Sequence, residues 1–345
     1  MKVRHRDGHS VIHLVLGPVD VAIDKSCLLA AQVDVPTVRK RPPPIFPESA
    51  SAILARVTSI DYSDRRRQLL ANVAEWAGSE QNIRVAILTG SAAREADDSD
   101  ALSDLDIELY VEDPAALLSE RSWYRRFGRV LAVEELPNPG WHPTRLLYLQ
   151  GGKIDFMIAS WAALPGTRYE RVYRVLVDKD SLTVDLPPPE RTDVAPPTPE
   201  AFDTCVNWFS AAAIMSARCI ARGDPWAAKF RDWDLKVELL KMIEWDHRAR
   251  YGWDYDTWFN AKHLDLWVDA EIRSALDSCW AGFSPADATL ALLASMDLFV
   301  RLAERTAPAV GAAWVESSAV CREVETILAM GGFGGPDVSS DAPSV

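Results

Sequence analysis

The chain has 345 residues, with 37 basic and 50 acidic side chains and a formal net charge of −13. Its 48% hydrophobic residues, together with 13 Trp, 10 Phe and 8 Tyr, exclude a wholly disordered chain. Affinity for nucleic acid comes mostly from Lys and Arg that neutralise phosphates, so the acidic balance argues against such a partner and favours a cationic one. The length suffices for two domains, each with its own core.

The cysteines and the hydropathy pattern point to a reducing compartment. The five cysteines are far apart in the sequence and form no CxxC pair, which argues against a disulfide framework. No run approaches the roughly 18 apolar residues of a membrane span, and charged residues interrupt the apolar run near the N-terminus. We therefore expect a cytoplasmic protein with no membrane partner.

The first part of the chain mixes helix and strand patterns. Residues 1–58 are an N-terminal extension to which the sequence assigns no role. Within residues 59–185, apolar spacing predicts a helix from about Asp61, with Ser63 as its N-cap. A further helix is predicted at 114–127, after Pro114. The predicted strands are 84–88, 105–111, 129–136, 145–149 and 153–159, of which the last two form a hairpin.

A proline-rich segment, 186–200, follows and contains six of the 22 prolines. Proline fixes φ and lacks an N–H donor, so this segment is predicted to be a stiff linker. Residues 201–332 show helical periodicity, and 333–345 are predicted to be a flexible tail. The helical runs are 201–222, 228–250, 265–281, 285–306 (with Ser284 as N-cap) and 312–330. We expect three tryptophans of this part to lie in its core: Trp208, Trp233 and Trp245.

A Gly-Ser turn and three carboxylates form the segment that suggests chemistry. Asp104 and Asp106 alternate with apolar residues in a strand pattern, so both project from one face, about 7 Å apart. Two such carboxylates repel each other unless a divalent cation lies between them, and Mg²⁺ prefers oxygen ligands combined with substrate phosphates. Gly90 and Ser91, before this strand, offer backbone N–H groups and a hydroxyl to a phosphate. Asp155 is a third acid, set among apolar residues of a later strand.

The alternative is an ordinary solvated strand face. A D-x-D pattern alone usually means such a face, and a lone Asp155 is more often an ion-pair partner. The combination of a Gly-Ser turn, a D-x-D strand and a further aspartate on a later strand favours the metal site.

Gly90-Ser91 with Asp104-Leu105-Asp106 resembles the signature of polymerase-β-type nucleotidyltransferases. Within that superfamily the chain resembles the aminoglycoside (streptomycin) 6-adenylyltransferases from about residue 60 to 330. The further stretches that carry this resemblance are Trp123 with Phe127-Gly128, Tyr148-Leu149, Gly151–Ile158, Asp178–Asp180, Ala228-Lys229 and Glu238–Trp245. The sequence departs from the family where Arg commonly follows Gly-Ser directly and Asn-Pro comes soon after; these places hold Ala92, Arg94 and Glu95.

The resemblance implies an α+β fold. An N-terminal nucleotidyltransferase domain, with a mixed β-sheet flanked by helices, would be followed by an all-α helical-bundle domain that binds the substrate. The protein would be a monomer or a homodimer.

The resemblance also implies roles for individual residues. Asp104 and Asp106 would hold Mg²⁺ against the triphosphate of ATP, the co-substrate. Asp155 would complete the metal site or act as general base, and both roles stay open. The expected nucleotide-binding residues are Gly90, Ser91, Arg94 and Lys229. The expected anchors for substrate cations are Asp232, Asp234, Glu238 and Glu244. For Lys229 and for each of these acids, an exposed residue of a solvated helix face remains the alternative.

The implied activity is transfer of AMP from Mg-ATP to a hydroxyl of streptomycin or a related aminoglycoside, with release of pyrophosphate. Such an enzyme confers antibiotic resistance. Two alternatives remain open: the same transfer to another small-molecule or protein acceptor, and a catalytically silent binding protein with the same fold. A polymerase is disfavoured because neither half of the chain is basic by composition.

Overall fold

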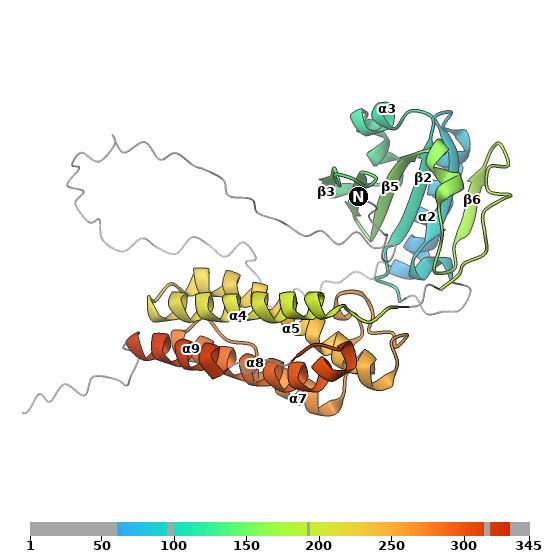
Figure 1. Ribbon diagram of the computed structural model, residues 1–345. Helices are drawn as coiled ribbons and strands as arrows, with labels where there is room; N and C mark the ends of the chain where they lie inside the picture. Colours follow the sequence, from blue (N-terminus) through green and yellow to red (C-terminus); the bar gives the residue numbers. More distant parts are fainter. Residues whose placement is uncertain (1–60, 95–99, 192–193, 314–317, 332–345) are drawn as a thin grey trace, which may run out of the picture. The chain divides into compact units, whose positions relative to one another are not determined.

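The computed structural model describes residues 61–94, 100–191, 194–313 and 318–331. The chain divides into two compact units, Met1–Thr192 and Asp193–Val345, which are drawn in Figure 1. The division falls within the proline-rich segment 186–200. The predicted N-terminal extension 1–58 and the predicted tail 333–345 lie outside the described residues.

The first unit is built on one mixed sheet of six strands in the order β3-β4-β5-β2-β1-β6. The strands are β1 Ile83–Thr89, β2 Leu105–Val111, β3 Val130–Leu136, β4 Thr144–Leu149, β5 Gly152–Ser160 and β6 Arg174–Asp178. Neighbouring strands run antiparallel except β2 and β5, which pair in parallel at the centre of the sheet. The five strands predicted from the sequence are confirmed; β6 was not predicted.

Helices cover one face of this sheet: α2 (Tyr62–Ser79), α3 (Pro114–Ser119) and the 3₁₀ helix η2 (Ser122–Phe127) (Figure 1). Trp76 of α2 stacks on Trp123 of η2, with ring centroids 4.9 Å apart, and both contact Phe156 of β5 edge-on. Leu105, Ile107 and Leu109 of β2 are buried in the same cluster. The period-two alternation of β2 therefore turns its acidic residues to the opposite face.

Two local predictions for these helices are wrong. The N-cap of α2 is Asp61, whose side chain accepts a hydrogen bond from the Asp64 N–H, and Ser63 lies inside the helix. The predicted helix 114–127 is two elements, because α3 ends at Ser119 and η2 begins at Ser122. The indole N–H of Trp123 donates to the Leu117 carbonyl, which holds the two elements together across the break.

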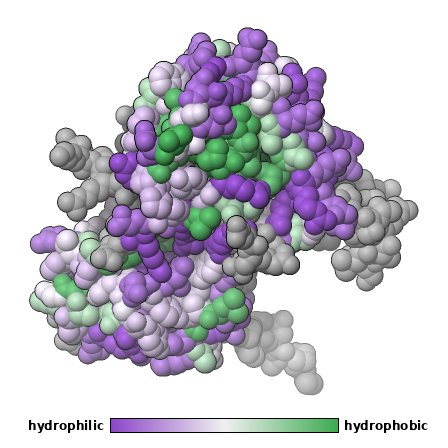
Figure 2. Space-filling view, turned by 90° about the vertical axis from the view of Figure 1, so that its right-hand side faces the viewer, coloured by the Kyte–Doolittle hydropathy of each residue, from purple (hydrophilic) through white to green (hydrophobic). Residues whose placement is uncertain are grey.

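The opposite face of the sheet carries a smaller core. Val85, Ile87, Tyr110 and Ala159 are buried there against Leu164 of the 3₁₀ helix η3 (Trp161–Gly166). Figure 2 views the molecule from the side on which β6 lies in Figure 1, and shows hydrophobic surface gathered on this unit. The exposed apolar side chains of the β6 region are Val172, Val175 and Val184. The end of the sheet at β6 is thus apolar in part.

The second unit is helical. Its helices are α4 Pro199–Ala221, α5 Pro225–Tyr251, α6 Leu264–Trp267, α7 Ala270–Ser278, α8 Pro285–Thr306 and α9 Ser318–Met330. Ser284 caps α8, as predicted, by accepting a hydrogen bond from the Asp287 N–H. The predicted run 265–281 is divided between α6 and α7. Together with the first unit, this confirms the α+β fold with an all-α second part.

The core of the second unit includes Phe209 of α4 and Phe299 of α8, whose rings stack with centroids 3.7 Å apart. Trp245 packs against this core. The prediction that Trp208 and Trp233 are core residues is wrong, because they are 63% and 62% exposed.

Candidate active site

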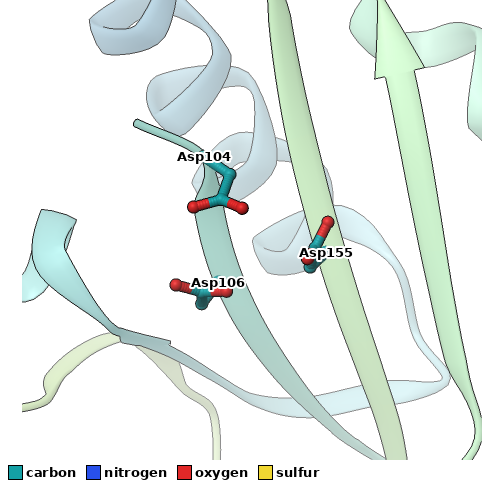
Figure 3. Close-up of side chains that lie close together, drawn as sticks. All are labelled: Asp104, Asp106 and Asp155. Carbon is teal, nitrogen blue, oxygen red and sulfur yellow. The ribbon is translucent and has the colours of Figure 1, made fainter. Parts of the chain in front are cut away.

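Three aspartates meet at the centre of the sheet on the face opposite α2. Asp106 of β2 lies directly opposite Asp155 of β5 in the parallel register, and Asp104 immediately precedes β2. One carboxylate oxygen from each of the three residues lies within 4.8 Å of the others. Figure 3 shows the three side chains on adjoining strands, with their carboxylates directed into the same space. The structure therefore brings together all three aspartates singled out in the sequence.

Strand geometry explains this convergence. The apolar neighbours Leu105 and Ile107 are buried under α2, and side chains alternate between the two faces of a strand. Asp104 and Asp106 consequently share the other face. In-register parallel pairing then places Asp155 beside them.

Gly90 lies against this cluster at the end of β1. Its φ of 68° and ψ of −155° are accessible to glycine and strained for other residues. A Cβ at this position would overlap the Asp106 carboxylate. Glycine is therefore required both by the backbone conformation and by the closeness of Asp106.

The turn after Gly90 presents the other predicted phosphate-binding residues. Ser91 begins the short 3₁₀ helix η1 (Ser91–Ala93), which ends where the Arg94 N–H donates to the Ser91 carbonyl over 3.3 Å. Thr89, just before the turn, donates its hydroxyl to the Asp106 carbonyl over 3.4 Å. The turn is thus fastened to the strand that carries the aspartates.

Lys153 joins two of the three carboxylates. Its ammonium donates to Asp104 Oδ2 over 3.0 Å and to Asp155 Oδ2 over 2.6 Å. Burial alone would lower the pKa of Lys153, but the hydrogen bonds and charges of Asp155 and Asp104 outweigh it and raise that pKa. Lys153 is therefore positively charged at neutral pH.

One carboxylate oxygen of Asp155 accepts the hydrogen bond from Lys153, and the other has no hydrogen-bond partner. Its Oδ1 is buried and has no hydrogen-bond partner, which is costly for a carboxylate oxygen. Burial raises the pKa of Asp155, and the contact with Lys153 only partly offsets this effect. A divalent cation fits these observations, because it would take the free oxygen and stabilise the ionised carboxylate.

Sequence reasoning missed Lys153 although the signal was present. Lys153 precedes Asp155 by two residues in a strand, so the two side chains share a face. Its contact with Asp104, 49 positions earlier, depends on the pairing of β2 with β5, which alternation alone does not reveal.

Glu108 is a second residue that the sequence reasoning missed. It lies two residues after Asp106, on the same face of β2, and accepts hydrogen bonds from the hydroxyls of Tyr110 (3.0 Å) and Tyr169 (2.6 Å). Burial raises the pKa of Glu108, and the two hydrogen bonds partly oppose this rise. The two tyrosines fix this carboxyl group in the small core beyond the aspartates.

The remaining predicted site residues lie on α5 of the second unit. The Lys229 ammonium donates to the Ala281 carbonyl over 2.7 Å. Asp232 pairs with Lys236, whose side chain is buried and also contacts Ser295. The other three acids differ in their surroundings: Asp234 pairs with Arg231 where both are exposed, Glu238 pairs with Lys241, and Glu244 is half-buried. Their roles toward a substrate stay predictions.

Among the described residues, no helix is long and apolar enough to cross a membrane.

The comparisons with known proteins agree on one family. The family model for streptomycin adenylyltransferase matches residues 64–321. An aminoglycoside 6-adenylyltransferase of Staphylococcus aureus is 26% identical over 226 residues, which cover 61% of this chain and 79% of the relative. One from Campylobacter jejuni is 24% identical over 220 residues, which cover 60% of this chain and 76% of the relative.

A solved structure is also similar. The crystal structure of an aminoglycoside 6-adenyltransferase from Bacillus subtilis has 17% sequence identity and a TM-score of 0.38, with 76% of this chain and 97% of that chain covered.

Proposed function

The chain belongs to the streptomycin adenylyltransferase family, and from this premise we propose that it transfers AMP from Mg-ATP to a hydroxyl of streptomycin or a related aminoglycoside. The observation that carries the proposal is the convergence of Asp104, Asp106 and Asp155 beside the Gly90 turn. Three carboxylates of this kind suit a reaction whose substrates are a metal-bound triphosphate and a hydroxyl group.

The proposed transfer is a displacement at the α-phosphorus of ATP. The acceptor hydroxyl oxygen forms a bond to the α-phosphorus of ATP, and the bond from that phosphorus to the bridging oxygen of pyrophosphate breaks. A bound Mg²⁺ would supply Lewis-acid stabilisation of the phosphate oxygens. Asp104 and Asp106 would hold it, and Asp155 would either complete the metal site or take the hydroxyl proton.

The turn after β1 would hold the leaving pyrophosphate. We propose that the Gly90 backbone and the Ser91 hydroxyl contact the β- and γ-phosphates, because successive backbone N–H groups in a turn can form a concavity that binds anions. Arg94, three residues on from Ser91, is the proposed charged contact in this segment. We propose Lys229 as a further triphosphate contact, since its ammonium has two N–H donors beyond the one given to Ala281.

The acids of α5 would anchor ammonium or guanidinium groups of the acceptor. Asp232 neutralises the buried Lys236, so it is less free than Asp234 to bind a substrate. Asp234 and its partner Arg231 are about half exposed, and such a pair is weak enough to be exchanged. We therefore rank Asp234 above Asp232 as an anchor.

Pyrophosphate release from ATP and Mg²⁺ with a panel of aminoglycosides tests the proposal. We expect release with streptomycin, and a product heavier than the drug by one AMP unit in its mass spectrum. Asp106→Asn should abolish release. Asp185→Asn, an exposed aspartate of the same unit, is the matched control and should leave it intact.

The other outcomes separate the alternatives. Release with another acceptor but not with any aminoglycoside would assign the same chemistry to a different substrate. Unchanged cellular function in the double variant Asp104→Asn, Asp106→Asn would favour a silent binding protein and exclude an enzyme.

A further inference from the structure

Lys153 places its ammonium among the three aspartates. Its ammonium contacts Asp104 Oδ2 and Asp155 Oδ2 at 3.0 and 2.6 Å, so it bridges the two carboxylates from different strands. A cation that bridges two carboxylates in this way neutralises their repulsion without any metal.

A third contact, with the ring of Tyr148, also holds the lysine in this position. Lys153 lies opposite Tyr148 in the β4–β5 register, and its ammonium lies 5.7 Å from the centre of the Tyr148 ring. The Tyr148 hydroxyl donates to Glu134 of β3 over 3.1 Å, which ties the ring of this β4 residue to the neighbouring strand. The side chain of Lys153 is only 27% exposed. These contacts hold the Lys153 ammonium in one position.

The two carboxylate oxygens of Asp155 differ in their contacts. Oδ2 accepts the lysine, whereas Oδ1 is buried without a partner. The Lys153 ammonium is therefore already bound to one oxygen of Asp155, and the other oxygen is left without a hydrogen-bond partner.

The charges balance with one divalent ion. Three ionised aspartates carry three negative charges, of which the ammonium neutralises one and a single divalent ion the other two. A second divalent ion would add positive charge beside the ammonium, at a distance where repulsion is strong in a partly buried site.

We propose that Lys153 is a resident second cation of the active site, a positioning residue that holds Asp104 and Asp155 together and limits the three aspartates to one divalent ion. This inference rests on the proposed use of a metal by these aspartates, but not on the identity of the acceptor. It assigns to a side chain the place that a second metal ion fills in sites with two metals.

Mn²⁺ binding to the full chain, counted by electron paramagnetic resonance without nucleotide, tests the proposal. We expect one ion per chain in the unaltered protein and two in Lys153→Met, with no ion at this site in Asp106→Asn. Lys153→Arg keeps the charge and should bind one. Lys262→Met, which removes an exposed lysine of the second unit, is the matched control and should also bind one.

Thermal unfolding in EDTA and in Mn²⁺ gives a second measurement. Removing the ammonium leaves two neighbouring carboxylates without their shared partner, so Lys153→Met should melt lower than the unaltered protein in EDTA. Mn²⁺ should raise its melting temperature by more than it raises that of the unaltered protein. Lys153→Arg should show neither difference.

A single Mn²⁺ ion in Lys153→Met would overturn the proposal, since the lysine would then not exclude a second ion. Loss of all binding in this variant would also overturn it, because the lysine would then only support the fold. Neither measurement uses adenylyl transfer, so a failure to modify aminoglycosides would reject the proposed acceptor and leave this inference standing.

Discussion

At the scale of single residues, Gly90 is where the site is most sensitive to one added carbon. Gly90→Ala places a Cβ on the Asp106 carboxylate, which must then move away from the other two aspartates. We expect weaker Mn²⁺ binding and at least about tenfold slower adenylyl transfer, because displacements of about 1 Å in a reacting site have effects of this size or larger. Titration with Mn²⁺ and initial rates measure both.

Gly140→Ala is the matched control for this substitution. Gly140 also has a positive φ, 82°, but a Cβ there meets nothing within 4 Å. The Gly140→Ala substitution should lower the stability only through backbone strain, by about 1–2 kcal/mol, and should leave metal binding unchanged. Equal effects of the two substitutions on metal binding would show that the closeness of Asp106 to Gly90 is unimportant.

The residues of the site differ in how well the sequence alone predicts them. Asp104 and Asp106 were predictable because alternation places both on one face, and Asp155 because a charge among apolar strand residues is unusual. Lys153 and Glu108 obey the same alternation, but their importance comes from partners far away in the sequence. Those partners are set by strand order, and strand order was not predictable from local pattern.

At the scale of elements, Asp178 closes the turn that follows β6. It accepts hydrogen bonds from the Leu182 and Thr183 N–H groups and from the Thr183 hydroxyl, at 2.7 to 2.9 Å. Burial alone would raise the pKa of Asp178, but these hydrogen bonds outweigh it and lower that pKa. The ionised carboxylate is therefore the form that stabilises the turn.

This gives a pH-dependent prediction. A carboxyl group with a lowered pKa in the folded state stabilises the protein above its ordinary pKa, and the contribution is lost as pH falls through the folded value. Asp178→Asn should lower the free energy of unfolding at pH 7 by about 1–3 kcal/mol. The difference from the unaltered protein should shrink when urea unfolding is measured below about pH 4. A difference that is constant with pH would contradict this role.

An ion-pair network centred on a buried carboxylate joins α5 to α8. Asp246 is fully buried, and its carboxylate binds Arg250 on its own helix at 2.7 Å and Arg305 of α8 at 2.8 Å. Asp246→Ala removes the buried carboxylate that Arg250 and Arg305 share, although Arg250 keeps its contact with Asp269. It should cost about 2–3 kcal/mol, measured by urea unfolding. Asp277→Ala breaks an exposed pair with Arg273 and should cost at most about 1 kcal/mol. Similar losses in both variants would contradict the importance of burial.

The elements themselves were largely predictable, with informative failures. The strand β6 was missed because its place depends on pairing with β1 and its own sequence is short. The helix 114–127 was predicted as continuous, whereas Trp123 turns back to the Leu117 carbonyl and interrupts it. Trp208 and Trp233 were assigned to the core because large aromatic residues are usually buried; in this unit they face outward.

At the scale of the whole molecule, the net charge of −13 bears on the proposed acceptor. A polycation is attracted to an acidic protein, and salt screens this attraction. We expect the KM for streptomycin to rise severalfold as KCl increases from about 50 to about 500 mM, since the Debye length falls well below 10 Å over this range. The melting temperature, measured in the same buffers, controls for a change in fold. A KM that does not depend on salt would show that acidity has no part in binding.

The parallel pairing of β2 with β5 has a consequence for comparing relatives. Asp106 and Asp155 are opposite each other because their strands are in register, and this register does not depend on the length of the loops that join α3, η2, β3 and β4 between the two strands. Insertions or deletions in those loops are therefore compatible with an intact triad, whereas a single residue inserted in β5 before Asp155 would turn the aspartate to the other face. A search for related proteins by fixed spacing between these aspartates would miss working members, and one that aligns the two strands would find them.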